Sequence, residues 1–381
     1  MSYMLLRLIW WGLVGILLIG FAIMDGHDLG VGALSPFVGK SDSERRAIIN
    51  SITPHWDGNQ VWLITAGGAI FAAWPLVYAA SFSMLYIAIL AVLWTIFLRP
   101  VAFEYRSKIA NVNWRKTWDW VLFIASATPA LLFGVAFGNL FIGVPFHFDA
   151  NMRVFSDQPS IIMGFLNLLS PFTILAGLVS LSMLVAHGGT YLALRTEQQI
   201  QQRAKFAAIL FSVITIIIFA AGGIYLHYIN GFIAHNLDPN APSDPLFKNV
   251  IATPGAWLNN YLSYPWLLIL PSIGIVGQIF TIALNKLNKH GFAFITSAIS
   301  IAGIILTAGV SLFPFILPSS SALNSSLTLW DATSTQHTLL LMLVAALIFT
   351  PIVLIYTSWV YKIMRGKLTV AKIEENSKSY Y

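Results

Sequence analysis

The segment that decides the fold is Ser51-Ile-Thr-Pro-His-Trp-Asp-Gly-Asn-Gln-Val-Trp-Leu-Ile64. It places Asp57 directly before a run of residues apolar enough to cross a bilayer. The polar and aromatic neighbours of this acid are His55, Trp56, Asn59 and Gln60. Ionisable residues inside membranes are costly, usually face the interior of a helix bundle, and often mark paths for protons or ions. The segment therefore predicts a membrane-spanning helix with a functional acid at its start.

The composition of the whole chain fits that prediction. The 381 residues have a mean hydropathy of +0.76 and only 9% of them are charged, against about 25% in soluble domains. Such a chain cannot cover a water-facing surface, so we expect one all-α polytopic membrane domain over residues 1–381. The net charge of +6 reflects cations in short loops, where membrane topology favours them, and does not indicate a nucleic-acid partner. The absence of cysteine excludes disulfides, iron–sulfur clusters and cysteine-ligated zinc or haem.

Apolar runs of roughly 20 residues predict nine spans. They lie near 5–24, 58–76, 78–98, 118–142, 161–186, 206–230, 263–285, 291–316 and 336–361. The first is followed by Asp25-Gly-His-Asp28 and not by a small-residue cleavage site, so it reads as a retained helix and not as a signal peptide.

The loops between these spans differ in charge. Of the 21 Lys and Arg residues, 18 fall in alternate loops and at the C-terminal end. The other side has only Arg7, Arg153 and Lys248. Because cytoplasmic loops carry the excess of positive charge, the N-terminus is expected outside and the C-terminus in the cytoplasm.

A second acidic motif follows the first span. Asp25 and Asp28 are three residues apart, so a continuing helix would place both on one face. One interpretation is a helix end at the cytoplasmic surface, where water solvates both acids. The other is a buried polar funnel in which His27 or a neighbouring helix shares protons. The motif also contains Gly26, Gly30 and Gly32, and glycines that permit close helix approach favour the buried interpretation.

Asp57 is the stronger candidate for proton transfer. Burial favours the protonated form of a carboxyl group, which suits a residue that takes up and releases protons. The alternative is structural: an acid that caps the helix start after Pro54, or that pairs with a loop arginine. Glu104 lies in a cytoplasmic loop close to Arg106, and by itself would be a surface ion pair.

Some histidines and methionines in the spans are candidate haem or metal ligands. The candidates are His187, His227, His337, Met183 and Met342. No paired histidines at helical spacing and no His-x-x-Glu motif occur, so the pattern does not support a metal site. We expect these histidines to lie at the membrane interface.

Five segments resemble subunit II of the bacterial cytochrome bd quinol oxidase. They are Met24-Asp-Gly-His-Asp-Leu-Gly-Val-Gly32, Pro54-His-Trp-Asp-Gly-Asn-Gln-Val-Trp-Leu-Ile64, Arg99-Pro-Val-Ala-Phe-Glu-Tyr-Arg-Ser-Lys108, Gly134-Val-Ala-Phe-Gly-Asn-Leu140 and Leu327-Thr-Leu-Trp-Asp-Ala332. The resemblance extends in order from Leu6 to Tyr380.

The resemblance implies a fold of two four-helix bundles plus one peripheral helix. It also implies membership of an inner-membrane complex that oxidises quinol, reduces dioxygen to water and builds a proton motive force. In that family two b-type haems and haem d are bound mainly by subunit I, an obligate partner. Small single-helix accessory subunits occur, and some members hold a structural quinone in subunit II. The isolated chain is expected to hold no catalytic residue and no metal ligand.

The resemblance further implies that Asp57 belongs to a proton pathway and that Glu104 lies near its cytoplasmic mouth. Asp25 and Asp28 match an acidic pair of the family. Position 104 departs from the family pattern, which has aspartate there, so the reach of this acid is one methylene longer.

Two other classes of function stay open from the residues alone. A secondary transporter could use the membrane acids to couple protons to a solute, although no inverted repeat or matched pair of broken helices is visible. A purely structural scaffold for a haem subunit would need the acids only for assembly.

Overall fold

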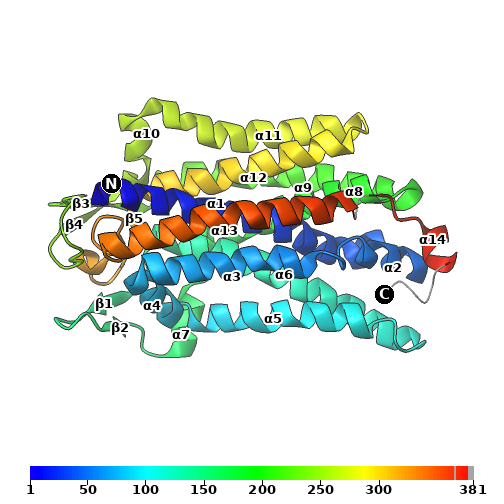
Figure 1. Ribbon diagram of the computed structural model, residues 1–381, viewed down its shortest axis with the longest axis horizontal. Coiled ribbons are helices and arrows are strands. Elements are labelled where there is room, and N and C mark those ends of the chain that lie inside the picture. The colour runs from blue at the N-terminus through cyan, green and yellow to red at the C-terminus, as the bar shows by residue number, and fades with distance from the viewer. Residues whose placement is uncertain (364–365, 376–381) are drawn as a thin grey trace.

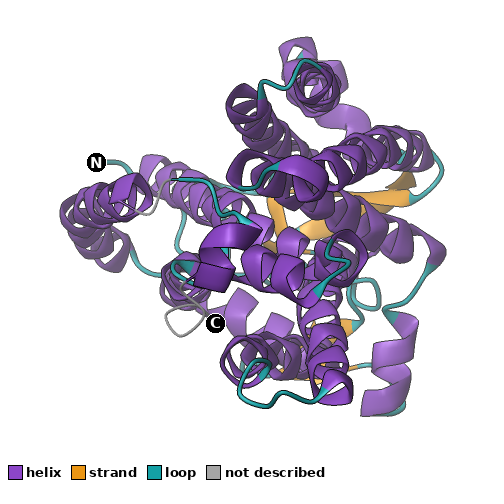
Figure 2. Cartoon of the chain, turned by 90° about the vertical axis from the view of Figure 1, so that its right-hand side faces the viewer, coloured by secondary structure: helices purple, strands orange, loops and turns teal. Residues whose placement is uncertain are grey.

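The computed structural model describes residues 1–363 and 366–375. Long helices lie side by side along one axis (Figure 1), and the view along that axis shows them gathered around each other (Figure 2). Within the described residues, eight helices are long and apolar enough to cross a membrane. They are α1 (Tyr3–Val38), α5 (Tyr86–Tyr105), α6 (Val112–Ile142), α8 (Pro171–Arg195), α9 (Gln198–Tyr225), α11 (Ile269–Lys286, extended by the 3-10 turn η2, Pro265–Leu268), α12 (His290–Leu312) and α13 (Gln336–Ile363).

The predicted second span is the one that is missing from those eight. It corresponds to α3 (Trp56–Ala73), which lies alongside the long helices in Figure 1. Three polar residues of its first two turns, Asp57, Asn59 and Gln60, reduce its apolar length below that of its neighbours. The prediction of nine equivalent spans therefore depends on how α3 is counted.

The first helix is much longer than its predicted range of 5–24. Ser2 caps α1 by accepting a hydrogen bond from the Leu5 backbone N–H over 3.3 Å, and the helix then continues to Val38. The prediction ended the helix where its apolar run ended, and that was wrong. The polar motif is held inside the bundle because its glycines allow close contact: a Cβ added at Gly30 would lie 2.0 Å from the Leu184 carbonyl oxygen, and one at Gly32 would lie 2.0 Å from Ser126 Oγ.

The chain between α1 and α5 contains breaks that the sequence analysis did not place. The short helix α2 (Asp42–Asn50) begins with a capping box formed by Ser41 and Glu44. α3 ends at Ala73, and α4 (Pro75–Met84) starts with a proline at its first position, where proline is best tolerated. The predicted span 78–98 is therefore divided between α4 and α5, and α5 continues to Tyr105.

The predicted span 161–186 is also two helices. α7 (Ile161–Asn167) is short, and α8 begins at Pro171 after the Ser170 cap. The proline restricts the residue before it to extended backbone, which ends one helix and starts the next. The remaining predicted spans differ from the observed helices at their ends, most clearly where α12 stops at Leu312, before Pro314, and where residues 226–230 follow α9 as turn and strand.

Three of the connections between long helices fold into small hairpins. The antiparallel pairs are β1 (Phe146–Phe148) with β2 (Val154–Ser156), β3 (Asn230–His235) with β4 (Asn249–Pro254), and β5 (Phe315–Leu317) with β6 (Leu327–Thr328). The short elements η1 (Ala256–Leu258), α10 (Asn259–Ser263) and η3 (Leu323–Ser325) complete this end. Figure 1 shows the hairpins together at the end that holds the N-terminus, opposite α2 and α14 (Val370–Glu375). Arg365 and Lys378, two of the C-terminal cations predicted to be cytoplasmic, lie outside the described residues.

A buried ion pair joins two of these hairpin segments. Lys248 Nζ lies 2.8 Å from Asp331 Oδ2, and the two side chains are 1% and 7% exposed. Burial raises the pKa of Asp331 although Lys248 opposes this effect, and burial lowers the pKa of Lys248. Each charge is therefore stabilised by the other, and the Thr328 N–H also donates a hydrogen bond to Asp331.

Replacing Lys248 by methionine is expected to lower the free energy of unfolding by about 3 kcal/mol, because it leaves the buried Asp331 carboxylate without its counter-ion. Thermal unfolding of the detergent-purified protein measures this loss. The double variant Lys248→Met/Asp331→Asn should regain most of it, since no buried charge remains. Equal stability of the single variant and the unchanged protein would contradict the prediction.

Candidate functional site

Three polar residues of α1 lie inside the helix bundle. Asp25, His27 and Asp28 all have an exposed fraction of 0%. The interpretation of the two acids as a water-solvated helix end is therefore wrong, and the buried interpretation is confirmed for their position. Apolar residues of α1, α8 and α12 pack next to the motif, among them Leu29, Leu184 and Ile301.

Asn59 of α3 connects this motif to two other segments. Its Nδ2 donates to Asp28 Oδ2 over 2.7 Å and to His55 Nδ1 over 3.1 Å. Its Oδ1 accepts a hydrogen bond from the hydroxyl of Tyr361 on α13 over 2.8 Å. The amide thus occupies both of its N–H groups and links α1, α3 and α13. The sequence predicted His55 and Asn59 as supporting groups around an acid, and in the structure that acid is Asp28.

His27 and Asp28 face each other without a hydrogen between them. His27 Nδ1 lies 3.0 Å from the Ile23 carbonyl oxygen, which can only accept, so Nδ1 carries the proton of the neutral ring. His27 Nε2 then holds a lone pair 3.2 Å from Asp28 Oδ1, and both atoms are buried without a hydrogen-bond partner. One added proton, on either residue, would complete a hydrogen bond between them.

His55 extends the network toward α8. Its Nε2 lies 2.8 Å from the Tyr191 hydroxyl, which itself donates to the Ser51 carbonyl oxygen over 3.0 Å. The ring stacks on Tyr361 with a centroid distance of 4.9 Å. Ligand atoms of His27, Asp28 and His55 lie within 4.8 Å of one another, as a metal site would require. However, the His55 Nδ1 lone pair already accepts from Asn59, so a single proton between His27 and Asp28 fits this arrangement better than a metal ion.

Asp25 has a different partner. The guanidinium of Arg99 on α5 binds its carboxylate in a bidentate pair, with Nη1–Oδ2 and Nη2–Oδ1 distances of 3.0 and 2.8 Å. The side chains are 1% and 0% exposed. Such charge-assisted pairs are strong and geometrically specific. Asp25 and Asp28 therefore share a helix face but occupy separate environments. Both oxygens of Asp25 bind arginine, whereas Asp28 Oδ1 has no hydrogen-bond partner and could accept a proton.

Asp57 does not point into this network. Its side chain is exposed on the chain, whereas His55 and Asn59 on either side of it point inward. Residues two apart on a helix do not share a face, so the first turn of α3 presents an acid outward and an amide inward. The expectation that Asp57 faces the interior of this chain is wrong. Gln60 is partly exposed.

Glu104 lies close to the start of α3. Trp56 packs on Phe103 with ring centroids 6.0 Å apart, and these two residues directly precede Asp57 and Glu104. The ion pair expected between Glu104 and Arg106 is absent. Glu104 Oε1 instead binds Lys108 Nζ at 2.7 Å, one helical turn away, with both side chains largely exposed.

Arg106 instead binds a buried acid, Asp119, which no sequence motif indicated. Its Nε lies 2.6 Å from Asp119 Oδ1 on α6, and Arg45 binds Oδ2 of the same carboxylate at 2.7 Å. In a further ion pair of α2, Glu44 binds Arg203 of α9 at 2.5 Å. Burial alone would raise the pKa of Glu44, but hydrogen bonds from Arg203 and from the Lys40 and Ser41 backbone outweigh it and lower that pKa. These pairs anchor α2 to the bundle.

The histidines and methionines weighed as haem ligands do not fit a haem held by this chain alone. His187 is buried in α8, so its predicted interfacial position is wrong. Its Nδ1 accepts from Ser297 at 2.9 Å and its Nε2 donates to the Ile23 carbonyl at 3.1 Å, which leaves no nitrogen for iron. His227 and His337 are exposed. Met183 packs inside one apolar cluster of the core and Met342 packs against another.

Three members of the site were missed from the sequence. Arg99 was assigned to a loop because the predicted span ended at residue 98, and an arginine beside an apolar run was the available signal. Tyr191 and Tyr361 gave no signal, because tyrosines near span ends are ordinarily interfacial anchors.

Replacing Asn59 by leucine of similar size should remove all three hydrogen bonds of the amide. Asp28, His55 and Tyr361 would each lose a buried partner, and we expect the free energy of unfolding to fall by about 3 kcal/mol. Tyr361→Phe, which removes only one of these bonds, should cost about 1 kcal/mol. Thermal unfolding of both variants checks the ratio, and equal losses would show that the amide is not the centre of the network.

The fold and the buried network define a polytopic helical membrane protein with ionisable groups held inside its bundle. The family model for cytochrome bd terminal oxidase subunit II matches residues 6–364. The chain belongs to this family, and it is a multi-pass protein of the bacterial inner membrane.

Individual relatives agree. The chain is 49% identical over 382 residues to the cytochrome bd-I ubiquinol oxidase subunit 2 of Escherichia coli K12, with 100% of both chains covered. It is 49% identical over 381 residues to a probable cytochrome oxidase subunit 2 of Haemophilus influenzae, again with 100% coverage of both. A chain in the structure of bd oxidase from Geobacillus thermodenitrificans has the same fold, with a TM-score of 0.69, 15% identity, and coverage of 94% of this chain and 98% of the other.

Proposed function

We propose that this chain acts as subunit II of a cytochrome bd-type complex that oxidises quinol and reduces dioxygen to water. In this role it supports the haem-bearing subunit I and conducts protons from the cytoplasm toward it. Membership of the family implies a complex with subunit I. The proton-conducting role is our inference from the arrangement of the buried and exposed acids.

One observation carries the proton proposal: the buried His27–Asp28 pair is completed by a single proton. Dry protein needs such relay groups, since a free proton is not stable in the hydrocarbon region. Asn59 and His55 hold Asp28 in place, so the pair can gain or lose a proton without changing its geometry. Asp25 stays in the proposal as the ionised partner of Arg99, which sets the charge beside the relay.

The route to subunit I is proposed to use Glu104 and Asp57. Glu104 is exposed near the basic end of the chain, and the Trp56–Phe103 contact brings its segment beside that of Asp57. Asp57 faces outward at membrane depth, where an exposed acid in lipid would be costly. We infer that subunit I covers this acid and receives protons from it.

The remaining details of the complex follow from the same assignment. Two b-type haems and haem d are proposed to be bound mainly by subunit I. Both ring nitrogens of His187 are hydrogen-bonded within this chain, which supports ligation by the partner. The haems supply the electron transfer and oxygen chemistry. Protons taken from the cytoplasm for water formation, with quinol protons released outside, would build a proton motive force without a pump.

For the membrane arrangement we propose nine spans, with α3 as the ninth, and the N-terminus outside. The two ends of the described chain lie at opposite ends of the molecule (Figure 1), as an odd number of crossings requires. α13 has only Leu339 and Leu343 buried, which suits the single peripheral helix.

The orientation can be tested because the chain has no cysteine. We expect the variant Asn151→Cys, in the β1–β2 loop, to react with a membrane-impermeant maleimide in spheroplasts, which have lost the outer membrane but keep an intact inner membrane. Asn113→Cys, at the start of α6, should react only after the membrane is permeabilised. The reverse pattern would overturn the proposed orientation.

Purification of the tagged chain from its native membranes in mild detergent tests the assignment as a whole. We expect a larger partner by mass spectrometry and a reduced-minus-oxidised spectrum with the far-red band of haem d. A colourless chain without a partner, under conditions that preserve other membrane complexes, would contradict it. Solute uptake by the chain alone in vesicles would favour a transporter instead.

A further inference from the structure

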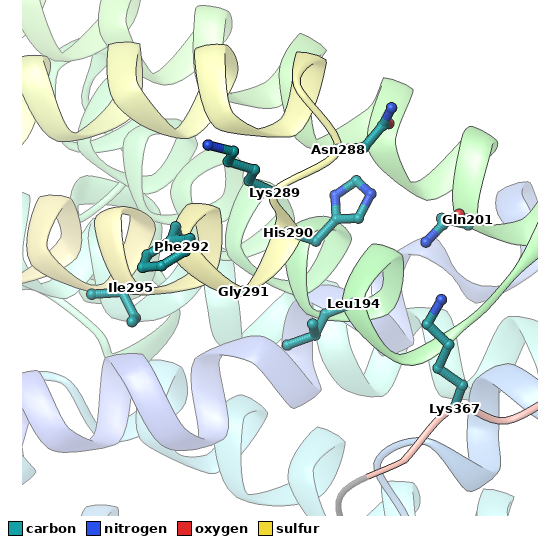
Figure 3. A pocket seen from close by; sticks show the side chains of 9 residues that line it. All are labelled: Leu194, Gln201, Asn288, Lys289, His290, Gly291, Phe292, Ile295 and Lys367. Atoms are coloured by element: carbon teal, nitrogen blue, oxygen red, sulfur yellow. The ribbon is translucent and has the colours of Figure 1, made fainter.

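A cavity of about 780 Å³ opens at the basic end of the bundle, and no residue of the network around Asp28 lines it. It lies where the end of α8, the start of α9, the α11–α12 turn and the segment after α13 meet. Figure 3 shows His290 between Lys289 on one side and Gln201 and Lys367 on the other. The proposed proton pathway uses none of these residues.

The cavity carries an excess of positive charge. Lys289 and Lys367 line it, and Lys205 lies beside it with its Nζ 2.8 Å from Asn288 Oδ1. Among the described side chains, Glu197 opposes these cations, 3.4 Å from Lys367 in an exposed pair, and exposed pairs of this kind are weak. The first turn of α12 adds the partial positive charge of a helix N-terminus. The local charge therefore favours an anionic group.

The polar wall of the cavity is held in a fixed geometry. His290 is only 7% exposed, and its Nδ1 donates to Asn285 Oδ1 over 2.9 Å. Asn285 Nδ2 in turn donates to Thr190 Oγ1 over 3.1 Å. Asn288 adopts the left-handed backbone with a φ of 58°, which makes the tight turn between α11 and α12. The turn and the histidine are thus positioned before any ligand binds.

An apolar surface continues from the charged part of the cavity. Phe292 and Ile295 line the cavity and are 65% and 54% exposed. Ile299, one turn further along α12, is 50% exposed. Their spacing of three and four residues places them on one face of the helix. This stripe runs from the lysines along a membrane-spanning helix, in the direction that an acyl chain takes in a bilayer.

We propose that this cavity binds the headgroup of an anionic phospholipid, with one acyl chain lying along the Phe292–Ile299 stripe. Basic pockets between membrane helices are suited to such headgroups. A free phosphate would use the lysines but not the stripe, so the combination favours a lipid. The site is independent of the proton pathway, and its failure would leave the proposed function untouched.

The test uses the delipidated complex with its partner subunit and haems, titrated with dioleoyl phosphatidylglycerol and followed by native mass spectrometry. The double variant Lys289→Gln/Lys367→Gln should bind this lipid about tenfold more weakly, because two cations near the headgroup are lost. The matched control Lys40→Gln/Lys116→Gln removes two exposed cations elsewhere and should bind as the unchanged complex does. Unchanged affinity in the first variant, or equal losses in both, would overturn the proposal.

Two further measurements separate a lipid from a simple anion. Millimolar inorganic phosphate should not displace the lipid from the unchanged complex, and displacement would overturn the assignment to a phospholipid. Phe292→Ala keeps every lysine and should weaken binding of the long-chain lipid several-fold, while binding of dihexanoyl phosphatidylglycerol stays the same. Equal effects on both lipids would show that the stripe holds no acyl chain.

Discussion

Replacing Asp57 by asparagine is expected to lower the dioxygen-reduction rate of the assembled complex at least about tenfold. The amide keeps the size and polarity of the side chain but cannot carry a proton at neutral pH, and a positioned proton-transfer group typically contributes more than that. Because Asp57 is exposed on this chain, the substitution leaves no buried partner unsatisfied within it. The rate is measured with an oxygen electrode, per haem, with a reduced quinol as the donor.

Two controls separate proton transfer from assembly. Asp57→Glu retains a titratable group and should retain a substantial part of the rate. Asp149→Asn removes a partly exposed acid of the β1–β2 loop that binds Arg153 and should leave the rate unchanged. A fully haem-loaded Asp57→Asn complex that turns over at the rate of the unchanged enzyme would remove Asp57 from the pathway. An oxidase insensitive to substitution of each acid named here would favour a structural scaffold.

Replacing Arg99 by methionine should have the largest effect on stability. Asp25 would remain fully buried without its bidentate partner, and breaking a buried pair from one side costs about 3–5 kcal/mol. We expect a markedly lower unfolding temperature and a reduced yield of haem-loaded complex. Thermal unfolding followed by haem absorbance measures the first, and the reduced-minus-oxidised spectrum of membranes measures the second.

The matched double variant shows whether the cost comes from the unpaired charge. Asp25→Leu/Arg99→Met replaces both partners by apolar side chains, which is often neutral or stabilising for a buried pair. It should therefore recover most of the lost stability. If the double variant is as unstable as Arg99→Met, lost packing rather than an unpaired carboxylate explains the effect.

Much of the fold could be predicted because apolar length is a direct physical requirement of the bilayer. Eight of the nine predicted spans contain or overlap a helix long enough to cross it. The ends were less predictable, and α1 shows why. Its apolar run stops at Met24, but the helix continues to Val38 since partner helices, close to Gly30 and Gly32, shield its polar turns. The sequence pattern of one segment does not show which helices will pack against it.

The candidate site could likewise be predicted only in part. The sequence identified the two acidic motifs, and the structure joined them through Asn59. The sequence did not indicate that Asp28 would be the inward acid and Asp57 the outward one, because that depends on how α3 is rotated against α1. Segments distant in the chain contribute Arg99, Tyr191 and Tyr361 to the site. Local sequence spacing therefore could not predict that these residues belong to it.

The sequence by itself determined that this protein crosses a membrane many times and which motifs carry its ionisable groups. Both follow from the cost of placing polar groups in hydrocarbon, which is set by composition and order along the chain. Only the tertiary structure decided which acid is paired, which is open to a proton and which faces outward. Those properties depend on distances of about 3 Å between side chains of different helices, and such distances are fixed by packing.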